Sequence, residues 1–274
     1  MRTLNEQMAL VQSLNVIDDV FFHKIAEDPE VCEEILRIIL EKPKLKVIQC
    51  QVQRFLRNNG VHSVILDALC ELDDGSHANI EVQKSDDDNH QKRVRFNQSN
   101  MDTLFTEKGI KYEELPDVYM VFISKFDMFG RGRTIYHIDR VIRETDEIVE
   151  NGVHEVYVNT AVNDGTEIAE LMQFFKKSSG MNKKFEKLCD RVDYFKQEKE
   201  GVKIMATLFE QYVAEERAEE RAEEQKRGIR STVKMCRKFG QSYEVAKASV
   251  LEEYPDIAEN IVDEIIDDVY GLVK

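Results

Sequence analysis

The sequence contains no long apolar segment. No stretch approaches the roughly 20 apolar residues that span a bilayer, and no apolar run follows the opening MRTLNEQMALVQSLN. We therefore expect neither a secretion signal nor a membrane span, and the expected compartment is the cytoplasm.

Cysteine is scarce and is never paired in the sequence. The five cysteines occur singly, with no CxxC pair, at Cys32, Cys50, Cys70, Cys189 and Cys236. This spacing is typical of buried thiols in an intracellular chain, and it predicts neither disulfides nor a zinc site.

The sequence also lacks a positive net charge, since its formal net charge is -15. This balance argues against a protein that coats nucleic acid with a broadly basic surface. A negative net charge does not exclude a nuclease, because only the electrostatic field at the active site has to be positive. The histidines are spread out with no HExxH spacing, and no G-x-S-x-G, P-loop or dinucleotide fingerprint occurs. These absences exclude the corresponding hydrolase and nucleotide-binding sites.

The chain has 274 residues, of which 42% are hydrophobic and 33% charged. This suits one large domain, or a catalytic domain with a helical appendage. Apolar spacing predicts two short helices within residues 18–41, where Asp28 caps the second and Pro29 is its first residue. Further elements are predicted as a strand at KVIQCQVQ, a hairpin over 63–83, a helix over 90–108, a buried strand at 117–126, and strands near an edge at RTIYHID and HEVYVNT. Strands interleaved with helices indicate a mixed α/β domain over residues 1–160.

Residues 161–274 read as a helical C-terminal region. The repeat EERAEERAEE places Glu and Arg at i,i+4 spacing on a helix. It is typical of a solvated connecting helix. A short coiled coil that forms a homodimer is the alternative, although few apolar a and d positions lie inside the repeat.

The segment SVILDALCELDDGSHANIEVQ, residues 63–83, raises a question of register. A three-residue turn at 73–75, with Gly75 left-handed, places Asp67 directly opposite Glu81. A two-residue Asp-Gly turn would instead pair Asp67 with Val82. Only the first register collects an apolar face, formed by Val64, Leu66, Ala68, Cys70, Ala78, Ile80 and Val82.

In that register the other face carries Asp67, Asn79, Glu81 and Gln83. Two like charges directly opposite on adjacent strands are destabilising unless a cation neutralises them. Carboxylates with water and substrate phosphate suit Mg²⁺. An exposed polar sheet face without a ligand is the alternative interpretation.

These residues resemble a known family. Asp67 before the turn, followed by IEVQ with Glu81 and Gln83, is similar to the D…ExK core of the PD-(D/E)XK nucleases. More narrowly, IDDVFFHKIAED, HANIEVQ and the segment from QKRVRFNQSN to FDMFGRG resemble the PD-(D/E)XK nuclease family transposases, or recombination-promoting nucleases. The resemblance covers at least residues 15–133 and, loosely, the whole chain.

The resemblance implies a mixed sheet flanked by helices and a DNA endonuclease activity. In this family Asp67 and Glu81, with the backbone carbonyl of Val82, would hold Mg²⁺, for which Mn²⁺ can substitute. The metal would polarise the scissile phosphate and activate a water for in-line attack. Gln83 occupies the position at which most of the superfamily has lysine, and the narrower family is similar to this chain in using glutamine there. Glutamine can orient a water but cannot accept its proton.

Two further groups are candidates. Asp19, on the first helix of the resemblance, could support the metal, although a first-turn helix acid is the simpler reading. DNA-phosphate contacts are expected among basic residues on the helix after the motif and on the FGRGR loop: Lys92, Arg93, Arg95, Arg131 and Arg133. Because Gln83 replaces lysine and the net charge is negative, a weak or inactive nuclease fold that binds DNA or protein is the alternative function.

Overall fold

The computed structural model describes residues 3–56, 64–86, 89–106, 109–179, 182 and 184–272. By packing, the chain divides into two compact units, Met1–Leu208 and Phe209–Lys274. The functional division at residue 160 remains a prediction; helices that follow residue 160 pack within the first unit. No helix among the described residues is both long and apolar enough to cross a bilayer.

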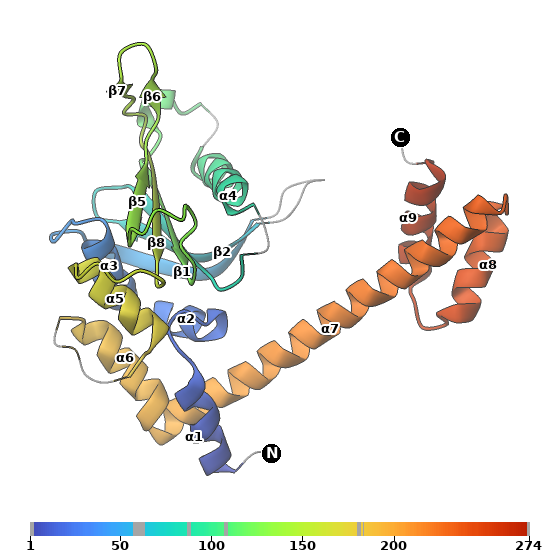
Figure 1. Ribbon diagram of the computed structural model, residues 1–274, viewed down its shortest axis with the longest axis horizontal. Coiled ribbons are helices and arrows are strands. Elements are labelled where there is room, and N and C mark those ends of the chain that lie inside the picture. Colours follow the sequence, from blue (N-terminus) through green and yellow to red (C-terminus); the bar gives the residue numbers. More distant parts are fainter. Residues whose placement is uncertain are drawn as a thin grey trace. The chain divides into compact units, whose positions relative to one another are not determined.

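The first unit is built on a six-stranded mixed sheet (Figure 1). Its strand order is β1-β2-β3-β4-β8-β5, in which β3, β4 and β8 are parallel and the other neighbours antiparallel. The strands are β1 (Val47–Leu56), β2 (Val64–Leu72), β3 (His77–Gln83), β4 (Val118–Ser124), β5 (Ile135–Ile138) and β8 (Val153–Asn159). A separate ribbon pairs β6 (Val141–Ile142) with β7 (Glu147–Ile148).

Among the described residues, six α-helices and one 3₁₀ turn lie wholly within this unit. They are α1 (Leu4–Ser13), α2 (Asp19–Ala26), α3 (Pro29–Ile39), α4 (His90–Phe105), η1 (Tyr112–Glu114), α5 (Glu167–Lys176) and α6 (Glu186–Gln197). The predicted break at Pro29 is confirmed: Asp28 caps α3 by accepting a hydrogen bond from the Glu30 N–H. The predicted buried strand is also confirmed, since all seven residues of β4 are buried.

Helices cover both faces of the sheet. The α4 side chains Val94 and Met101 pack with Met120 and Phe122 of β4. Helix α3 packs against β1 and the helices α2, α5 and α6, and α2 also lies against β1, β2 and β3. A sheet covered on both faces can bury polar residues on either one, which decides the environment of the hairpin carboxylates.

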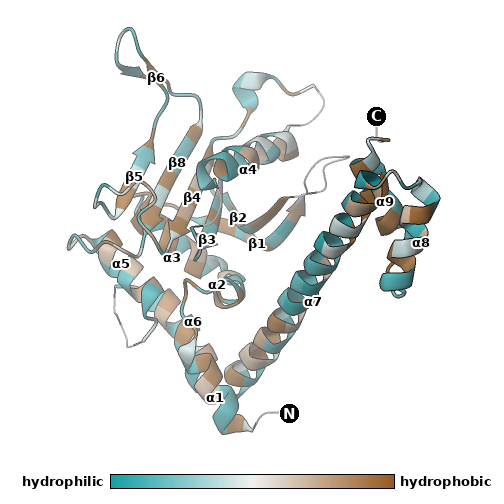
Figure 2. Cartoon of the chain, turned by 45° about the vertical axis from the view of Figure 1, so that its right-hand side comes forward, coloured by the Kyte–Doolittle hydropathy of each residue, from teal (hydrophilic) through white to brown (hydrophobic). Residues whose placement is uncertain are grey.

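The remaining helices confirm the predicted helical region. Helix α7 (Lys199–Lys238) begins in the first unit and continues into the second, followed by α8 (Tyr243–Glu253) and α9 (Glu259–Tyr270). Residues 214–224, which contain the whole Glu/Arg repeat, are exposed, and Figure 2 shows the middle of α7 as largely hydrophilic. The second unit has its own apolar core, formed by Ile229, Val233, Cys236, Ala246, Val250, Val262, Ile265, Ile266 and Val269.

Candidate active site

The turn between β2 and β3 sets the site's geometry. Gly75 is left-handed with φ of 84°, and the Leu72 N–H donates to the Ser76 carbonyl at 2.9 Å. The ladder pairs Ala68 with Ile80, so the next residues outward, Asp67 and Glu81, face each other. The predicted three-residue turn and its register are therefore confirmed. The Asp67 N–H donates to Glu81 Oε1 at 3.4 Å.

The polar face of the hairpin is not fully exposed, so the alternative interpretation of an exposed polar sheet face is wrong. Asn79 is 0% and Glu81 1% exposed. By the register, both lie on the same face as Met120 and Phe122, against which α4 packs. The helix thus covers the buried part of the acidic cluster, whereas Asp67 and Gln83 remain half-buried.

Asp67 is held by the backbone of β3. The Val82 N–H donates to Asp67 Oδ2 at 3.0 Å. Because the N–H and C=O of one strand residue leave the strand on the same side, the Val82 carbonyl is also directed toward β2. Nε2 of His23 lies 3.2 Å from Asp67 Oδ1, although without the alignment of a hydrogen bond.

Glu81 is a buried carboxylate that also accepts hydrogen bonds from two side chains. Asn79 Nδ2 donates to its Oε1 at 2.6 Å, and Arg93 donates to its Oε2 at 3.0 Å. Burial and then the neighbouring Asp67 carboxylate raise the pKa of Glu81 to about 7, against the opposing effect of Arg93. The negative charge of ionised Glu81 is therefore only partly neutralised by the residues around it.

Gln83 shares the arginine that binds Glu81. Arg93 donates to Gln83 Oε1 at 2.8 Å, and Gln83 Nε2 donates to the Ser85 carbonyl at 3.1 Å. The guanidinium of Arg93 thereby joins the second and third positions of the motif. A planar fork with several donors suits such a double contact better than an ammonium does.

Asp19 is the first residue of α2, and its side chain faces the same site. Burial and then the Asp67 carboxylate raise the pKa of Asp19. The adjacent N-cap residue Asp18 forms a 2.7 Å salt bridge with Lys84, which follows β3. Helix α2 is thereby tied to the end of the strand that carries Glu81 and Gln83.

Among the five basic candidates, Arg93 is the one that the described residues place on the carboxylates. The side chains of Lys92, Arg95, Arg131 and Arg133 belong to exposed residues. Their contact with DNA remains a prediction.

One neighbour of the site, His23, was missed by the sequence reasoning, and a second, Asn79, was placed on the polar face but was given no role. A signal for the first was present: Asp19 and His23 are spaced i,i+4 on one helix and so share a face. Asn79 precedes Glu81 by two residues on β3, which places both side chains on the same face of the sheet.

The family model for PD-(D/E)XK nuclease family transposases matches residues 26–228, which is more than half of the chain. The chain belongs to this family. The match includes the hairpin, α4 and the whole Glu/Arg repeat. Among curated proteins and solved structures, none matches the chain.

The fold agrees with this membership. The six-stranded mixed sheet with helices on both faces and a helical C-terminal region is a PD-(D/E)XK α/β architecture. Nucleases of the PD-(D/E)XK family act on DNA and generally use divalent metals. The motif residues of this chain lie on β2 and β3 of that sheet.

The donor set of this PD-(D/E)XK site fits a hard divalent cation. Mg²⁺ is usually bound by one or two carboxylates and keeps several waters or phosphate oxygens. Asp67, Glu81 and the carbonyl of Val82 are all oxygen donors, and the first two face each other across the hairpin. Asp19 does not converge with them as closely: among the described residues, no three carboxylates have oxygens within 4.8 Å of one another.

Proposed function

We propose that this protein is a metal-dependent DNA endonuclease of the recombination-promoting type, which hydrolyses phosphodiester bonds. The observation that carries the proposal is the pair of acids opposite each other on β2 and β3. Burial and the charge of Asp67 raise the pKa of Glu81 to about 7. A fold that holds two carboxylates in this arrangement is better stabilised by a cation than by its own residues.

Asp67, Glu81 and the Val82 carbonyl are the proposed ligands, for Mg²⁺ with Mn²⁺ as a substitute. Such an ion, when bound, polarises a phosphate oxygen and lowers the pKa of water. Asp19 is the proposed outer support, because its carboxyl group interacts electrostatically with Asp67.

The residues around the acids have positioning roles in this proposal. Gln83 has an amide that donates one hydrogen bond and accepts another, so it can orient a water. Arg93 already reaches Gln83 and Glu81, and a guanidinium at that place can turn to a DNA phosphate. The further phosphate contacts are proposed for Lys92, Arg95, Arg131 and Arg133.

A plasmid assay tests the proposal. Purified full-length protein is incubated with supercoiled DNA in Mg²⁺, in Mn²⁺ and in EDTA. We expect nicking that requires the metal and is lost in Asp67→Asn, which keeps the side chain's shape but removes its charge. The control is Asp139→Asn, at an exposed acid away from the hairpin. Equal cutting by Asp67→Asn and the control, or no cutting by folded wild-type protein in either metal, would refute the assignment.

Metal binding should depend on pH near neutrality. Because the pKa of Glu81 is raised to about 7, protons compete with the metal below that pH. We expect Mg²⁺ affinity to rise between about pH 6 and about pH 8, with up to one proton released per bound ion. Calorimetric titration in buffers of different ionisation enthalpy measures both quantities. An affinity that is flat over this range in wild-type protein would contradict the role of Glu81 as a ligand.

The second candidate function is a nuclease-fold protein that binds DNA or another protein without cutting. It is favoured by one observation, the uncharged Gln83 in place of lysine. The same titration separates the candidates, since Mg²⁺ binding that is lost in Asp67→Asn supports the enzyme. DNA binding without metal binding or cleavage supports the second candidate.

Homodimerisation through the C-terminal helices is also proposed, from the Glu/Arg repeat of α7. The cytoplasm is the proposed compartment.

A further inference from the structure

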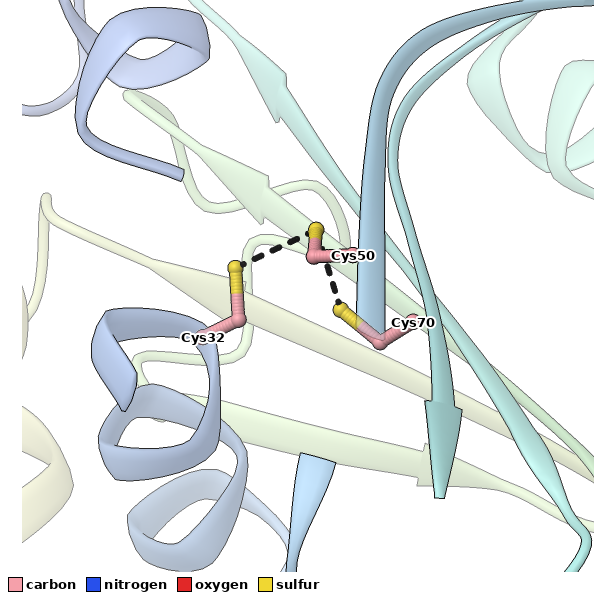
Figure 3. Close-up of side chains that lie close together, drawn as sticks. All are labelled: Cys32, Cys50 and Cys70. Atoms are coloured by element: carbon pink, nitrogen blue, oxygen red, sulfur yellow. Dashed lines mark hydrogen bonds between the residues drawn. The ribbon is translucent and has the colours of Figure 1, made fainter. Parts of the chain in front are cut away.

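Three of the five cysteines meet in the first unit, although they are far apart in the sequence (Figure 3). Cys32 lies on α3, Cys50 on β1 and Cys70 on β2. The Sγ atoms of Cys32 and Cys50 are 3.6 Å apart, and those of Cys50 and Cys70 are 3.4 Å apart. All three sulfur atoms lie within 4.8 Å of one another. Single cysteines scattered along the sequence gave no indication of this cluster.

The backbone fixes each of these side chains. Cys50 and Cys70 are direct partners in the antiparallel ladder of β1 and β2. Cys32 is on the first turns of α3, whose start is set by Asp28 and Pro29. Cys32 and Cys70 are 0% exposed, whereas Cys50 is half-buried. The cluster is therefore preorganised, with one partly accessible member.

The sulfur separations distinguish between two kinds of chemistry. In a tetrahedral site with metal–sulfur bonds of about 2.3 Å, neighbouring sulfur atoms are about 3.8 Å apart. In a disulfide they are about 2.05 Å apart. The observed 3.4 and 3.6 Å are within a few tenths of an ångström of the first arrangement. A disulfide would require one pair to approach by more than about 1 Å, and it would leave the third cysteine without a role.

We propose that Cys32, Cys50 and Cys70 form a binding site for a thiophilic divalent metal ion such as Zn²⁺. Binding of Zn²⁺ by three thiolates releases the protons of the thiols and leaves one coordination position for a water or an external ligand. The half-buried Cys50 is the member of the cluster that solvent reaches. Soft sulfur ligands do not suit Mg²⁺, so this site is separate in metal preference from the carboxylates of the hairpin.

Such a site would connect α3 to the β1–β2 pair. Strand β2 also carries Asp67, three residues before Cys70 and on the opposite face by strand alternation. Bound metal would therefore stabilise the edge of the sheet that supports the proposed active site, without contributing a ligand to it.

Cobalt spectroscopy tests this site on the full-length protein. The protein is reduced, stripped with a chelator, returned to Mg²⁺ buffer and titrated with Co²⁺, followed by Zn²⁺. We expect a sulfur-to-cobalt charge-transfer band in the near ultraviolet that saturates at one equivalent and disappears on addition of Zn²⁺. Cobalt bound by the hairpin carboxylates gives no sulfur band, so the two metal sites are distinguished.

The remaining cysteines provide matched controls. The band should be lost in Cys50→Ala and Cys70→Ala and retained in Cys189→Ala and Cys236→Ala. Cys50→Ala is the more informative variant, because Cys50 is half-buried and its truncation is the better tolerated; circular dichroism confirms its fold. Absence of the band in reduced wild-type protein, or its persistence in folded Cys50→Ala, overturns the proposal. So does a reduced protein that binds no Co²⁺ by sulfur but forms a Cys50–Cys70 disulfide in air, detected by peptide mapping.

Discussion

Glu81→Gln is expected to reduce Mg²⁺-dependent cleavage by more than about 100-fold, since changes even to groups that only support metal ligands cost about 10- to 100-fold. Glutamine has nearly the shape of glutamate, but its single carbonyl oxygen can accept a hydrogen bond from only one of Asn79 and Arg93, which donate to different oxygens of Glu81, and it brings no charge to the metal. The fold should survive. Burial raises the pKa of Glu81 from its ordinary value of 4.5 to about 7, so ionisation of Glu81 lowers the stability of the fold progressively as the pH rises through that range. At about pH 8 and without metal, removal of this buried charge should offset much of the cost of the one lost acceptor, about 1–3 kcal/mol, so Glu81→Gln should lose less stability in urea unfolding than Glu81→Ala.

Glu81→Ala is expected to behave differently. It leaves a cavity beside Asn79, and it removes the acceptor of three donors, the Asp67 N–H, Asn79 and Arg93, at a position that is almost inaccessible to solvent. A buried donor without a partner costs about 1–3 kcal/mol, so urea unfolding should show a clear loss of stability in addition to lost activity. Inactivity of this variant alone would therefore not identify a metal ligand.

Glu71→Gln is the matched control for these two variants. It makes the same chemical change on the same hairpin, at a half-buried position where the partner is Gln49. Plasmid nicking at wild-type rate is expected. Glu81→Gln activity equal to that of Glu71→Gln would remove Glu81 from the site.

Arg93→Met is expected to destabilise the metal-free protein by about 1–3 kcal/mol, because it leaves buried Glu81 without its ion-pair partner. The Arg93 side chain is 35% exposed, so solvent screens its charge, and the loss of stability should be smaller than for a fully buried ion pair. The change should be much smaller in a Glu81→Gln background, where no charge needs compensation. Urea unfolding of the four proteins of this double-mutant cycle measures the coupling.

Mg²⁺ should restore much of the stability that Arg93→Met removes, since the cation supplies the missing positive charge. Arg95→Met is the control, because Arg95 is an exposed neighbour on the same helix. A cycle with no coupling, or a loss that Mg²⁺ leaves unchanged, would show that Arg93 does not neutralise Glu81.

The elements that the sequence predicted best depend on local chemistry. Pro29 after Asp28 specifies the start of α3, Gly75 supplies a left-handed residue in the turn, and unbroken apolar content marks β4. The pairing of Asp67 with Glu81 follows from the same hairpin, because alternation couples the apolar face to the position of the acids.

The burial of Glu81 could not be predicted from the local sequence. It depends on α4 covering one face of the sheet, and period-2 alternation separates the two faces of a strand without showing what packs on each. Arg93 was one of several basic candidates, and only the packing of α4 places it on Glu81 and Gln83. The cysteine cluster depends on packing among α3, β1 and β2, so it could not be predicted from single cysteines that lie far apart in the sequence.

The hairpin turn also determines where this chain can change in length during evolution. One residue inserted into or deleted from either arm, 68–72 or 76–80, would rotate one acid to the other face of the sheet. A longer loop at 73–75 would leave the pairing of Leu72 with Ser76, and hence that of the acids, unchanged. Insertions and deletions among relatives should therefore concentrate at the tip of this hairpin, while both arms keep a constant length.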